Sequence, residues 1–525
     1  MDKLALLQEL TASSMTTQIV LLAIGSLLLH FLFVHSRNTF PGVPVHGRRG
    51  HWEPTFLPQS RFAVQAREII SSGYEKFKDR PFVVKRNDVD IMIMPNKYLE
   101  ELRLVPSAKL NATRAQAENL QYKWTYSASI TESDLHIRVI KNKLATELYK
   151  YLDVAKTELD YAWSIDVPSS REWREVEIQP MLHMLVARMS ARVFMGHPTC
   201  RDKEWLKLTI GFSIDMFTAA FTLRMFPLWT YPIVAHLIPA RYRLKKYLRS
   251  AERVIQPLKE SHADATKRRS LGQKVDVQDT LLNWTMDHGT EDENRIDKMS
   301  ARQMLLTLAS IHTTSTAATD VLLDLCAHPE WFPVLQEEID STTADLGPIG
   351  STSESVVKQW LTRLEKLDSF LVESQRRHPP LLLSPQRVAV EALMLKDGTY
   401  IPKGSKICWA GYDHINDPSI THNPDIFDPM RSYNKRHASP QYRNKYLAGQ
   451  TSPDNLVFGY GNQACPGRAF AVGEIKLILA RLVSQYDFQF PEHIRTRPAS
   501  KYADENVFPD PSVNLMMKIR GGGDD

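Results

Sequence analysis

The chain has 525 residues, 43% of them hydrophobic, so it is long and apolar enough to bury a large core. Its 65 Lys and Arg residues against 60 Asp and Glu residues give a net charge of +5, and the basic residues are dispersed, which argues against a nucleic-acid partner. The four cysteines show no paired framework, which favours a reducing compartment. They are Cys200, Cys326, Cys408 and Cys465.

The first predicted element is an apolar helix near the N-terminus. No Asp, Glu, Lys or Arg occurs in residues 10–36, and residues 15–34 would span roughly 30 Å as a helix, enough for one bilayer crossing. A cleaved secretory signal is the alternative, but no small-residue cleavage site precedes residues 40–44. Three arginines follow the segment before residue 50 and only Lys3 precedes it, so we expect the rest of the chain to be cytosolic.

The remainder of the chain has the pattern of one large domain. No long linker, charge block or repeat divides it. We therefore expect a membrane anchor at residues 1–36, one catalytic domain at 37–520 and a disordered tail at 521–525. Helical apolar patterns dominate, with short strands after Pro385 and near the C-terminus, so the predicted fold is mainly α with small β-sheets.

A second apolar stretch, residues 226–239, contains Pro227, Pro232 and Pro239 and cannot form a spanning helix. Its aromatic residues suit a contact with the membrane interface. An ordinary buried loop has the same composition and is the alternative.

A long helix is predicted from Ala301 to Ala327, because apolar residues recur at helical spacing on both sides of a polar centre. This centre runs from Ser310 to Thr316. Mid-helix Ser and Thr tend to bond back to the backbone and loosen the turn, so a polar pocket is expected there. A Thr-rich segment satisfied by its own carbonyls is the alternative.

The next helix is predicted from the apolar positions between Leu361 and Leu371, and it carries Glu373 and Arg376. Residues three apart share a helix face, so one guanidinium can clamp one carboxylate. The same spacing occurs at Glu100 to Arg103 and at Glu492 to Arg495, so the pattern alone has low specificity. Further on, Arg387 opens an extended run that a Gly turn near residue 398 joins to a second run, which predicts a small β-hairpin.

Residues 458–468 read Phe-Gly-Tyr-Gly-Asn-Gln-Ala-Cys-Pro-Gly-Arg and lead into a helical apolar repeat. Gly461 and Gly467 permit a tight turn that can present the sulfur of Cys465 as an anionic metal ligand, with N–H groups aimed at the thiolate. Phe458 would shield the sulfur. A lone Cys in a loop more often packs as a small hydrophobe, so this turn alone does not decide its role.

Taken together and in this order, these motifs resemble those of the haem-thiolate monooxygenases, the cytochrome P-450 superfamily. The loop matches Phe-x-x-Gly-x-(Arg or His)-x-Cys-x-Gly at every position but Gln463. Residues 309–314 are similar to the family's oxygen-activating helix, with Thr313 at the hydroxyl position and His312 in place of the acid. The family's Glu-x-x-Arg helix and later Pro-x-Arg element, which brace the haem loop, are matched by Glu373, Arg376 and Arg431.

The resemblance implies a P-450 fold that encloses haem, with Cys465 as the axial iron ligand. It places Arg387 against a haem propionate and leaves the charge balance there open, because neutral Gln463 stands where an Arg or His is usual. An earlier segment, Asp134 to Lys141, looks like the family's other propionate helix. Its candidates are His136, Arg138 and Lys141, with a solvated basic face an equal alternative. The cofactor-binding set is thus Cys465, Arg387, Phe458, Gly461, Gln463, Gly467 and His136.

The implied activity is insertion of one oxygen atom from O2 into a C–H bond of a lipophilic substrate. Electrons would come from NADPH through a separate P-450 reductase, because the chain has no Gly-x-Gly-x-x-Gly loop or flavin domain. His312, expected to titrate near neutrality, and Thr313 would relay protons as the catalytic pair. The segments expected to line the substrate pocket are residues 112–130, 226–239, 381–385 and 508–517.

Within the superfamily, the Cys loop and the polar helix look most like fungal enzymes of specialised metabolism, of the ent-kaurene-oxidase-like and indole-diterpene oxidase type. That implies a terpenoid-like substrate and a single-pass protein of the endoplasmic reticulum membrane, in contact with its lipids. Two alternatives stay open: a haem-thiolate isomerase or dehydratase that needs no reductase, and a non-catalytic haem-binding membrane scaffold. Dependence of turnover on NADPH and a reductase separates them.

Overall fold

The computed structural model describes Gly25 and residues 40–50, 53–348 and 354–521. The predicted membrane span at residues 15–34, apart from Gly25, lies outside the described residues, as does the predicted tail beyond Gly521. One described helix, α9 (Lys203–Arg224), is long and apolar enough to cross a bilayer, but 56% of its most apolar window is buried inside the protein. It is therefore explained as a core helix.

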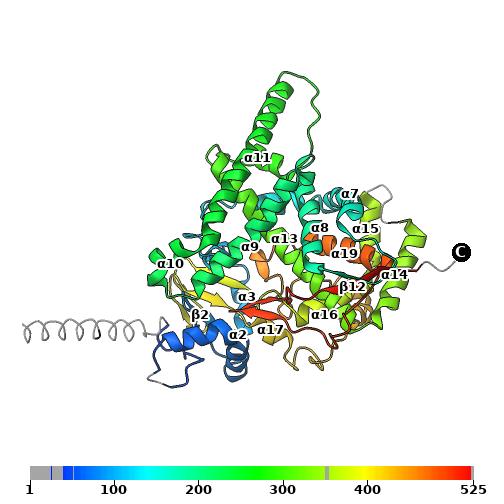
Figure 1. Ribbon diagram of the computed structural model, residues 1–525. Coiled ribbons are helices and arrows are strands. Elements are labelled where there is room, and N and C mark those ends of the chain that lie inside the picture. The colour runs from blue at the N-terminus through cyan, green and yellow to red at the C-terminus, as the bar shows by residue number, and fades with distance from the viewer. Residues whose placement is uncertain (1–24, 26–39, 51–52, 349–353, 522–525) are drawn as a thin grey trace, which may run out of the picture.

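Helices dominate the described part of the chain, which confirms the mainly α prediction (Figure 1). In Figure 1, α13 crosses the middle of the body and α11 extends outward from it. The α-helices are α2 (Phe56–Lys76), α3 (Leu99–Leu102), α4 (Ala112–Asn119), α5 (Ser129–Glu132), α6 (Leu135–Val139), α7 (Leu148–Asp166), α8 (Ile178–Phe194), α9, α10 (Tyr231–Leu237), α11 (Pro239–Ser270), α12 (Leu281–His288), α13 (Ile296–Ala327), α14 (Trp331–Leu346), α15 (Glu354–Arg363), α16 (Glu365–Arg377), α17 (Gly411–Ile415), α18 (Arg431–His437) and α19 (Arg468–Gln485).

The described residues also form four small β-sheets. The largest has the strand order β1-β2-β8-β5-β3, in which β2 and β8 are parallel and the other pairs antiparallel. The other orders are β4-β12-β9, β10-β11 and β6-β7. The strands are β1 (Phe82–Lys85), β2 (Asp90–Ile93), β3 (Leu110–Asn111), β4 (Arg174–Val176), β5 (Gln386–Ala389), β6 (Leu393–Met394), β7 (Tyr400–Ile401), β8 (Lys406–Cys408), β9 (Tyr486–Gln489), β10 (Lys501–Ala503), β11 (Asn506–Phe508) and β12 (Leu515–Ile519).

The predicted hairpin exists, but its strands differ from the expected ones. Its arms are β6 and β7, joined by a turn at Gly398 with a positive φ of 86°. The run that begins at Arg387 is instead β5, where Arg387 lies opposite Ile407 of β8 in the large sheet. Buried strand residues therefore hold Arg387, whereas a free-standing hairpin would have left it mobile.

The stretch at residues 226–239 forms short helices that its prolines start. Pro227 precedes the single turn η4 (Leu228–Thr230), and Pro232 and Pro239 lie in the first turns of α10 and α11, where a missing N–H costs nothing. The stretch does not span a membrane, as predicted. Tyr231 and Ile238 are buried, but other large apolar side chains of the stretch are exposed, with Leu237 at 73%, Ile233 at 69% and Trp229 at 59%, so an ordinary buried loop is excluded.

A network of buried charges ties the large sheet to distant segments. Arg86, at the end of β1, donates to Glu505 at 2.6 Å, and Arg224, at the end of α9, lies 2.9 Å from the other oxygen of that carboxylate. Asp88 and Asp504 also pair with these guanidinium groups. The turn between β10 and β11 is thereby fixed to both β1 and α9. Buried charges persist only when paired in this way.

We expect Glu505→Ala to lower the free energy of unfolding by about 3 kcal/mol or more, because two buried guanidinium groups each lose one carboxylate. Thermal unfolding followed by circular dichroism measures the effect. Glu118→Ala is the matched control, since its pair with Arg114 is at the surface, with side chains 30% and 46% exposed, and should cost far less. Equal midpoints for the two variants would contradict a structural role for the network.

Candidate active site

The loop at residues 458–468 folds back on itself before α19 begins at Arg468. The amide of Cys465 donates to the Phe458 carbonyl at 2.8 Å. Gly461 has a positive φ of 77°, and a Cβ there would lie 2.2 Å from the Arg103 carbonyl oxygen. Only glycine therefore fits at this position. Gly467 has an ordinary φ of −90°, and an added Cβ would meet no described atom within 4 Å, so the predicted steric need for glycine holds at Gly461 alone.

The thiol of Cys465 borders open space although protein surrounds it. The residue is exposed, yet burial raises the pKa of the thiol. The backbone N–H groups of Gly467 and Arg468 act in the opposite direction and favour the thiolate. An exposed residue whose thiol is desolvated indicates a hollow inside the protein, which can hold a group that bonds sulfur.

Helix α13 has an open face in its middle. From Met299 to Leu325 the helix is buried except at a few positions. Ala309 and Thr313 are exposed there, and Leu306 and Ala317 are partly exposed. These positions are three, four and four residues apart, so they form one stripe that borders a hollow. Thr313 donates its hydroxyl to the Ala309 carbonyl at 2.7 Å, the back-bonding expected of a mid-helix Thr.

The structure brings Glu373, Arg376 and Arg431 together. Arg376 makes a two-pronged contact with Glu373 at 2.9 and 2.6 Å, and both side chains are at most 3% exposed. Arg431 lies 3.4 Å from the same carboxylate, which also accepts the Asp428 amide at 3.0 Å. The Glu100 to Arg103 pair of equal spacing is 57% and 39% exposed. Burial thus distinguishes the copy that orders the chain before the Cys loop.

Arg387 is a buried cation without a carboxylate. Its guanidinium donates to two backbone carbonyls, those of Gln386 at 2.8 Å and Tyr460 at 3.1 Å. No described Asp or Glu forms an ion pair with it, and burial lowers its pKa to about 10. A buried guanidinium in this state is stabilised by an anionic ligand. Its bond to Tyr460 places it beside the Cys loop.

The side chain of Gln463 joins the Cys loop to the chain around the start of α4 through hydrogen bonds. Its Oε1 accepts the Ala112 amide at 2.8 Å, and its Nε2 donates to the Leu110 and Val105 carbonyls at 2.7 and 3.3 Å. Both ends of the amide are therefore engaged with the start of α4 and the chain just before it. The side chain has no donor left over for a second anion.

The three candidate propionate partners between residues 134 and 141 have different surroundings in the structure. Arg138 pairs with Asp134 at 2.8 Å and with Glu293 at 3.1 Å, and so already has partners. Lys141 donates to the Asn462 carbonyl at 3.1 Å and so contacts the Cys loop. His136 keeps its Nδ1 buried without a hydrogen-bond partner among the described residues, and burial lowers its pKa to about 4.

His312 lies in an aromatic cluster. Its ring centroid is 4.6 Å from Phe217 on α9, 5.8 Å from Phe508 on β11 and 5.9 Å from His183 on α8. Burial, with a smaller contribution from His183, lowers its pKa to about 4. The expectation that this imidazole titrates near neutrality is therefore wrong, because desolvation holds it neutral. Its role as a proton relay stays a prediction.

Sequence reasoning missed a buried polar chain across three helices. Glu474 of α19 is fully buried and accepts from the Ser190 hydroxyl of α8 at 3.3 Å, and Ser190 is 2.7 Å from the Ser310 hydroxyl of α13. Burial raises the pKa of Glu474 well above its usual range, which favours its neutral form. The sequence signal for this polar chain was Glu474, a single acidic residue within the apolar repeat after the Cys loop.

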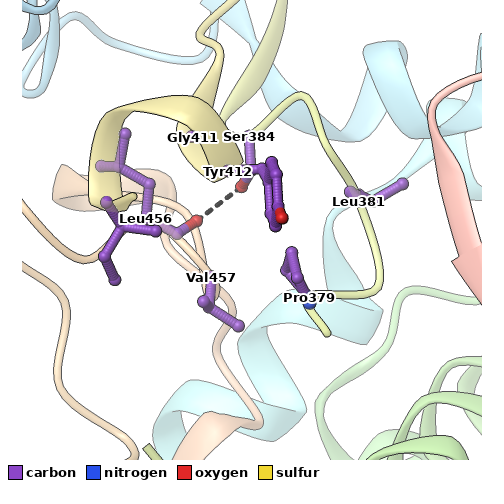
Figure 2. A pocket seen from close by; sticks show the side chains of 8 residues that line it. Pro379, Leu381, Ser384, Gly411, Tyr412, Leu456 and Val457 are labelled. Carbon is purple, nitrogen blue, oxygen red and sulfur yellow. Dashed lines mark hydrogen bonds between the residues drawn. The ribbon is translucent and has the colours of Figure 1, made fainter. Parts of the chain in front are cut away.

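A small cavity lies directly behind the Cys loop (Figure 2). Leu456 and Val457, just before the loop, line it together with Leu381 and Ser384 from the segment that joins α16 to β5. The Ser384 hydroxyl donates to the Leu456 carbonyl at 2.6 Å, the dashed line in Figure 2. The volume of this cavity, about 10 Å³, is at the lower limit for one water molecule. The cavity is therefore too small to admit a substrate, and the residues that line it pack the segment before the Cys loop.

These residues fit the haem of the resemblance. An open thiol offers one anionic ligand, the buried Arg387 lacks the anion that a propionate would supply, and α13 leaves an open apolar face with one hydroxyl. Of the expected pocket segments, Phe508 contacts His312 and residues 381–385 lie behind the loop. The lining role of residues 112–130 and 226–239 stays a prediction.

Comparison with known proteins gave one family and several fungal relatives. The family described as cytochrome P-450 matches residues 139–514. A cytochrome P-450 monooxygenase of Stachybotrys chlorohalonatus is 42% identical over 482 residues, which cover 91% of this chain and 90% of the relative. A monooxygenase of Sordaria araneosa is 38% identical, covering 93% and 90%. An ent-kaurene oxidase of Gibberella fujikuroi is 35% identical, covering 96% and 97%.

We expect Gly461→Ala to lower the thermal midpoint of the protein more than Gly467→Ala does. The first substitution forces a side chain into a positive φ, which costs about 1–3 kcal/mol, and adds a collision with the Arg103 carbonyl. The second meets no described atom and keeps an ordinary φ. Differential scanning calorimetry of the two variants makes the comparison, and equal midpoints would contradict the loop geometry.

His312 should make the fold sensitive to acid. Its pKa is about 4 in the folded chain against 6.5 when free, so between these values the unfolded chain binds the extra proton and stability falls as pH falls. We expect the wild type to lose up to about 2 kcal/mol from this group between pH 7.5 and 5. His312→Phe, which keeps the aromatic packing, should lose less. His197→Gln, at the surface, is the control, and thermal midpoints at both pH values decide the matter.

Proposed function

The chain belongs to the cytochrome P-450 family and is an oxidoreductase of the monooxygenase class; we propose that it hydroxylates a lipophilic, terpenoid-like specialised metabolite. The observation that carries the proposal is the Cys465 loop, whose thiol is open to an enclosed space while backbone N–H groups favour its anionic form. The electrons come from NADPH through a separate reductase.

In this proposal Cys465 holds the haem iron and Arg387 receives a propionate, while Phe458, Gly461, Gln463 and Gly467 shape the loop. Haem bound through a thiolate supplies oxygen activation and the oxidation of unactivated C–H bonds. The chain itself contributes by holding the Cys loop in a fixed position. The buried Glu373 clamp fixes the segment before the loop, and Gln463 fixes the loop to the chain before α4.

Thr313 is the residue we assign to proton handling in the hollow. Its hydroxyl proton points to the Ala309 carbonyl, so the oxygen lone pairs are the part open to the hollow. It can thus accept a hydrogen bond at rest and donate only after releasing Ala309. His312 next to it is neutral, and it would take part by exchanging one ring proton without carrying a charge.

The side chains around the hollow support a lipophilic substrate. Leu306 and Ala317 flank the open face of α13, and Phe217 and Phe508 surround His312. Such walls exclude water and bind apolar molecules by burial of surface. The relative from Gibberella fujikuroi is named for oxidation of ent-kaurene, which favours a terpenoid skeleton here.

We place the protein on the endoplasmic reticulum membrane, with residues 1–36 as a single-pass anchor and residues 37–520 as a cytosolic catalytic domain. The apolar sequence at residues 15–34 supports the anchor. The exposed Trp229, Ile233 and Leu237 support a second lipid contact through η4 and α10, and α10 and α2 both lie toward the left of Figure 1.

The proposal is tested first at the thiol. Cys465→Ala should abolish the strongly red-shifted Soret band of the reduced carbon monoxide complex, because no other thiol borders the loop. Cys408→Ala is the matched control, since Cys408 is fully buried in β8. Retention of the band in the Cys465 variant would contradict the assignment.

Turnover of a diterpene by microsomes containing the protein should also require both NADPH and reductase. Turnover without them would indicate an isomerase or dehydratase, and no turnover of any substrate would favour a scaffold.

A further inference from the structure

Arg302 on α13 is a second buried guanidinium, after Arg387, and the carboxylates of Glu293 and Glu132 attract it only from beyond ion-pair distance. Arg302 is 3% exposed, and its one hydrogen bond runs from NH1 to the Glu293 backbone carbonyl at 3.1 Å. Its Nε is buried with no hydrogen-bond partner, and no carboxylate in the described chain lies within ion-pair distance of it. A buried charge left in this state is costly, so it indicates a missing ligand.

Arg302 lines a cavity of about 210 Å³ between α5, the turn before α13 and α13 itself. The Ser129 hydroxyl in the lining is also buried without a hydrogen-bond partner, and His136, outside the lining, lies close enough to Arg302 for that charge to help lower its pKa. Donors or acceptors left over around one cavity suit a ligand with several oxygen atoms. The lining residues are Ser129, Glu132, Ser133, Thr290, Asp292, Glu293, Lys298 and Arg302.

The acidic residues of this cavity already have partners. Lys298 lies 2.6 Å from Asp292 and 3.2 Å from Glu132. Glu293 accepts from Arg138 at 3.1 Å and from the Thr290 amide at 2.8 Å, contacts that help hold its pKa near 2. These contacts leave Arg302 as the cation of the cavity that lacks a carboxylate of its own.

Arg302 continues the open face of α13. It precedes Leu306 by four residues, Ala309 by seven and Thr313 by eleven, so all four lie on one side of the helix. Eleven residues of helix correspond to about 16 Å. This side of the helix thus carries a buried cation at one end, an open apolar middle and a hydroxyl at the other end, which matches an elongated apolar molecule with one acidic end.

We propose that Arg302 binds a carboxylate of a ligand that lies along the open face of α13, with Ser129 and His136 as flanking polar contacts. A planar guanidinium binds a carboxylate through two parallel hydrogen bonds, which gives both strength and orientation. The carboxylate belongs either to a haem propionate or to the substrate or product. The inference rests on the proposed function, because it assumes that haem and a lipophilic substrate occupy the hollow.

The test uses Arg302→Met, which removes the charge at similar length, and Arg302→Lys, which keeps the charge and loses the two-pronged contact. Lys274→Met is the control, since Lys274 is exposed and lies outside the cavity lining. Two quantities are measured on the haem-loaded protein: the rate of haem transfer to apomyoglobin, and the ratio of dissociation constants for abietic acid and its methyl ester, by equilibrium dialysis.

If the carboxylate is a propionate, Arg302→Met should lose haem at least tenfold faster than the wild type. If it belongs to the substrate, the wild type should bind the acid at least tenfold more tightly than the ester, and Arg302→Met should abolish this preference at an unchanged rate of haem loss. Arg302→Lys should be intermediate in either case and carries the test if the Met variant does not fold. Lys274→Met should match the wild type.

Unchanged haem loss together with an unchanged acid-to-ester ratio in both Arg302 variants would overturn the proposal. A lower thermal midpoint with those two values intact would show that Arg302 only holds the turn before α13 through the Glu293 carbonyl. Failure of the proposed function looks different, because it is read in the wild type as absence of NADPH-dependent turnover. The haem-transfer and binding ratios do not depend on turnover.

Discussion

The site depends on one buried ion pair, that of Glu373 and Arg376. Neither group could stay charged in the interior alone, and their two-pronged contact satisfies both while leaving lone pairs and N–H groups for other segments. Glu373 uses them for the Asp428 amide, and Arg376 for the Pro424 and Ile426 carbonyls. The irregular chain between α17 and α18 therefore takes its course from α16. This chain precedes the Cys loop, whose own regular structure is limited to the single 3-10 turn η6 (Gly461–Gln463).

Much of this arrangement could be predicted from the sequence where the signal is local. The Gly461 turn, the helix through Thr313 and the Glu373 to Arg376 spacing are patterns within a few residues, and the structure contains all three. The single helix expected from Leu361 to Arg376 is instead two, α15 and α16, with non-helical angles at Leu364. A break of one residue leaves the apolar periodicity almost unchanged, so the pattern could not show it.

The rest could not be predicted because it depends on segments far apart in the chain. Gln463 was expected near a propionate, but its amide is engaged by residues about 350 positions earlier. The charge state of His312 follows from side chains of α8, α9 and β11, which no single stretch reveals. Arg302 belongs to none of the motifs found in the sequence. Its significance lies in a buried Nε without a hydrogen-bond partner among the described residues, and a sequence does not record that.

The hydrogen bonds of Gln463 determine how the Cys loop responds to salt and pH. An Arg or His at this position would hold the loop through charge, and salt or protons would weaken that hold. An amide bonded to the Ala112 N–H and the Leu110 carbonyl carries no charge at any ordinary pH. The joint between the Cys loop and the chain before α4 is therefore indifferent to ionic strength. This part of the hold on the sulfur is therefore the same at high and low salt.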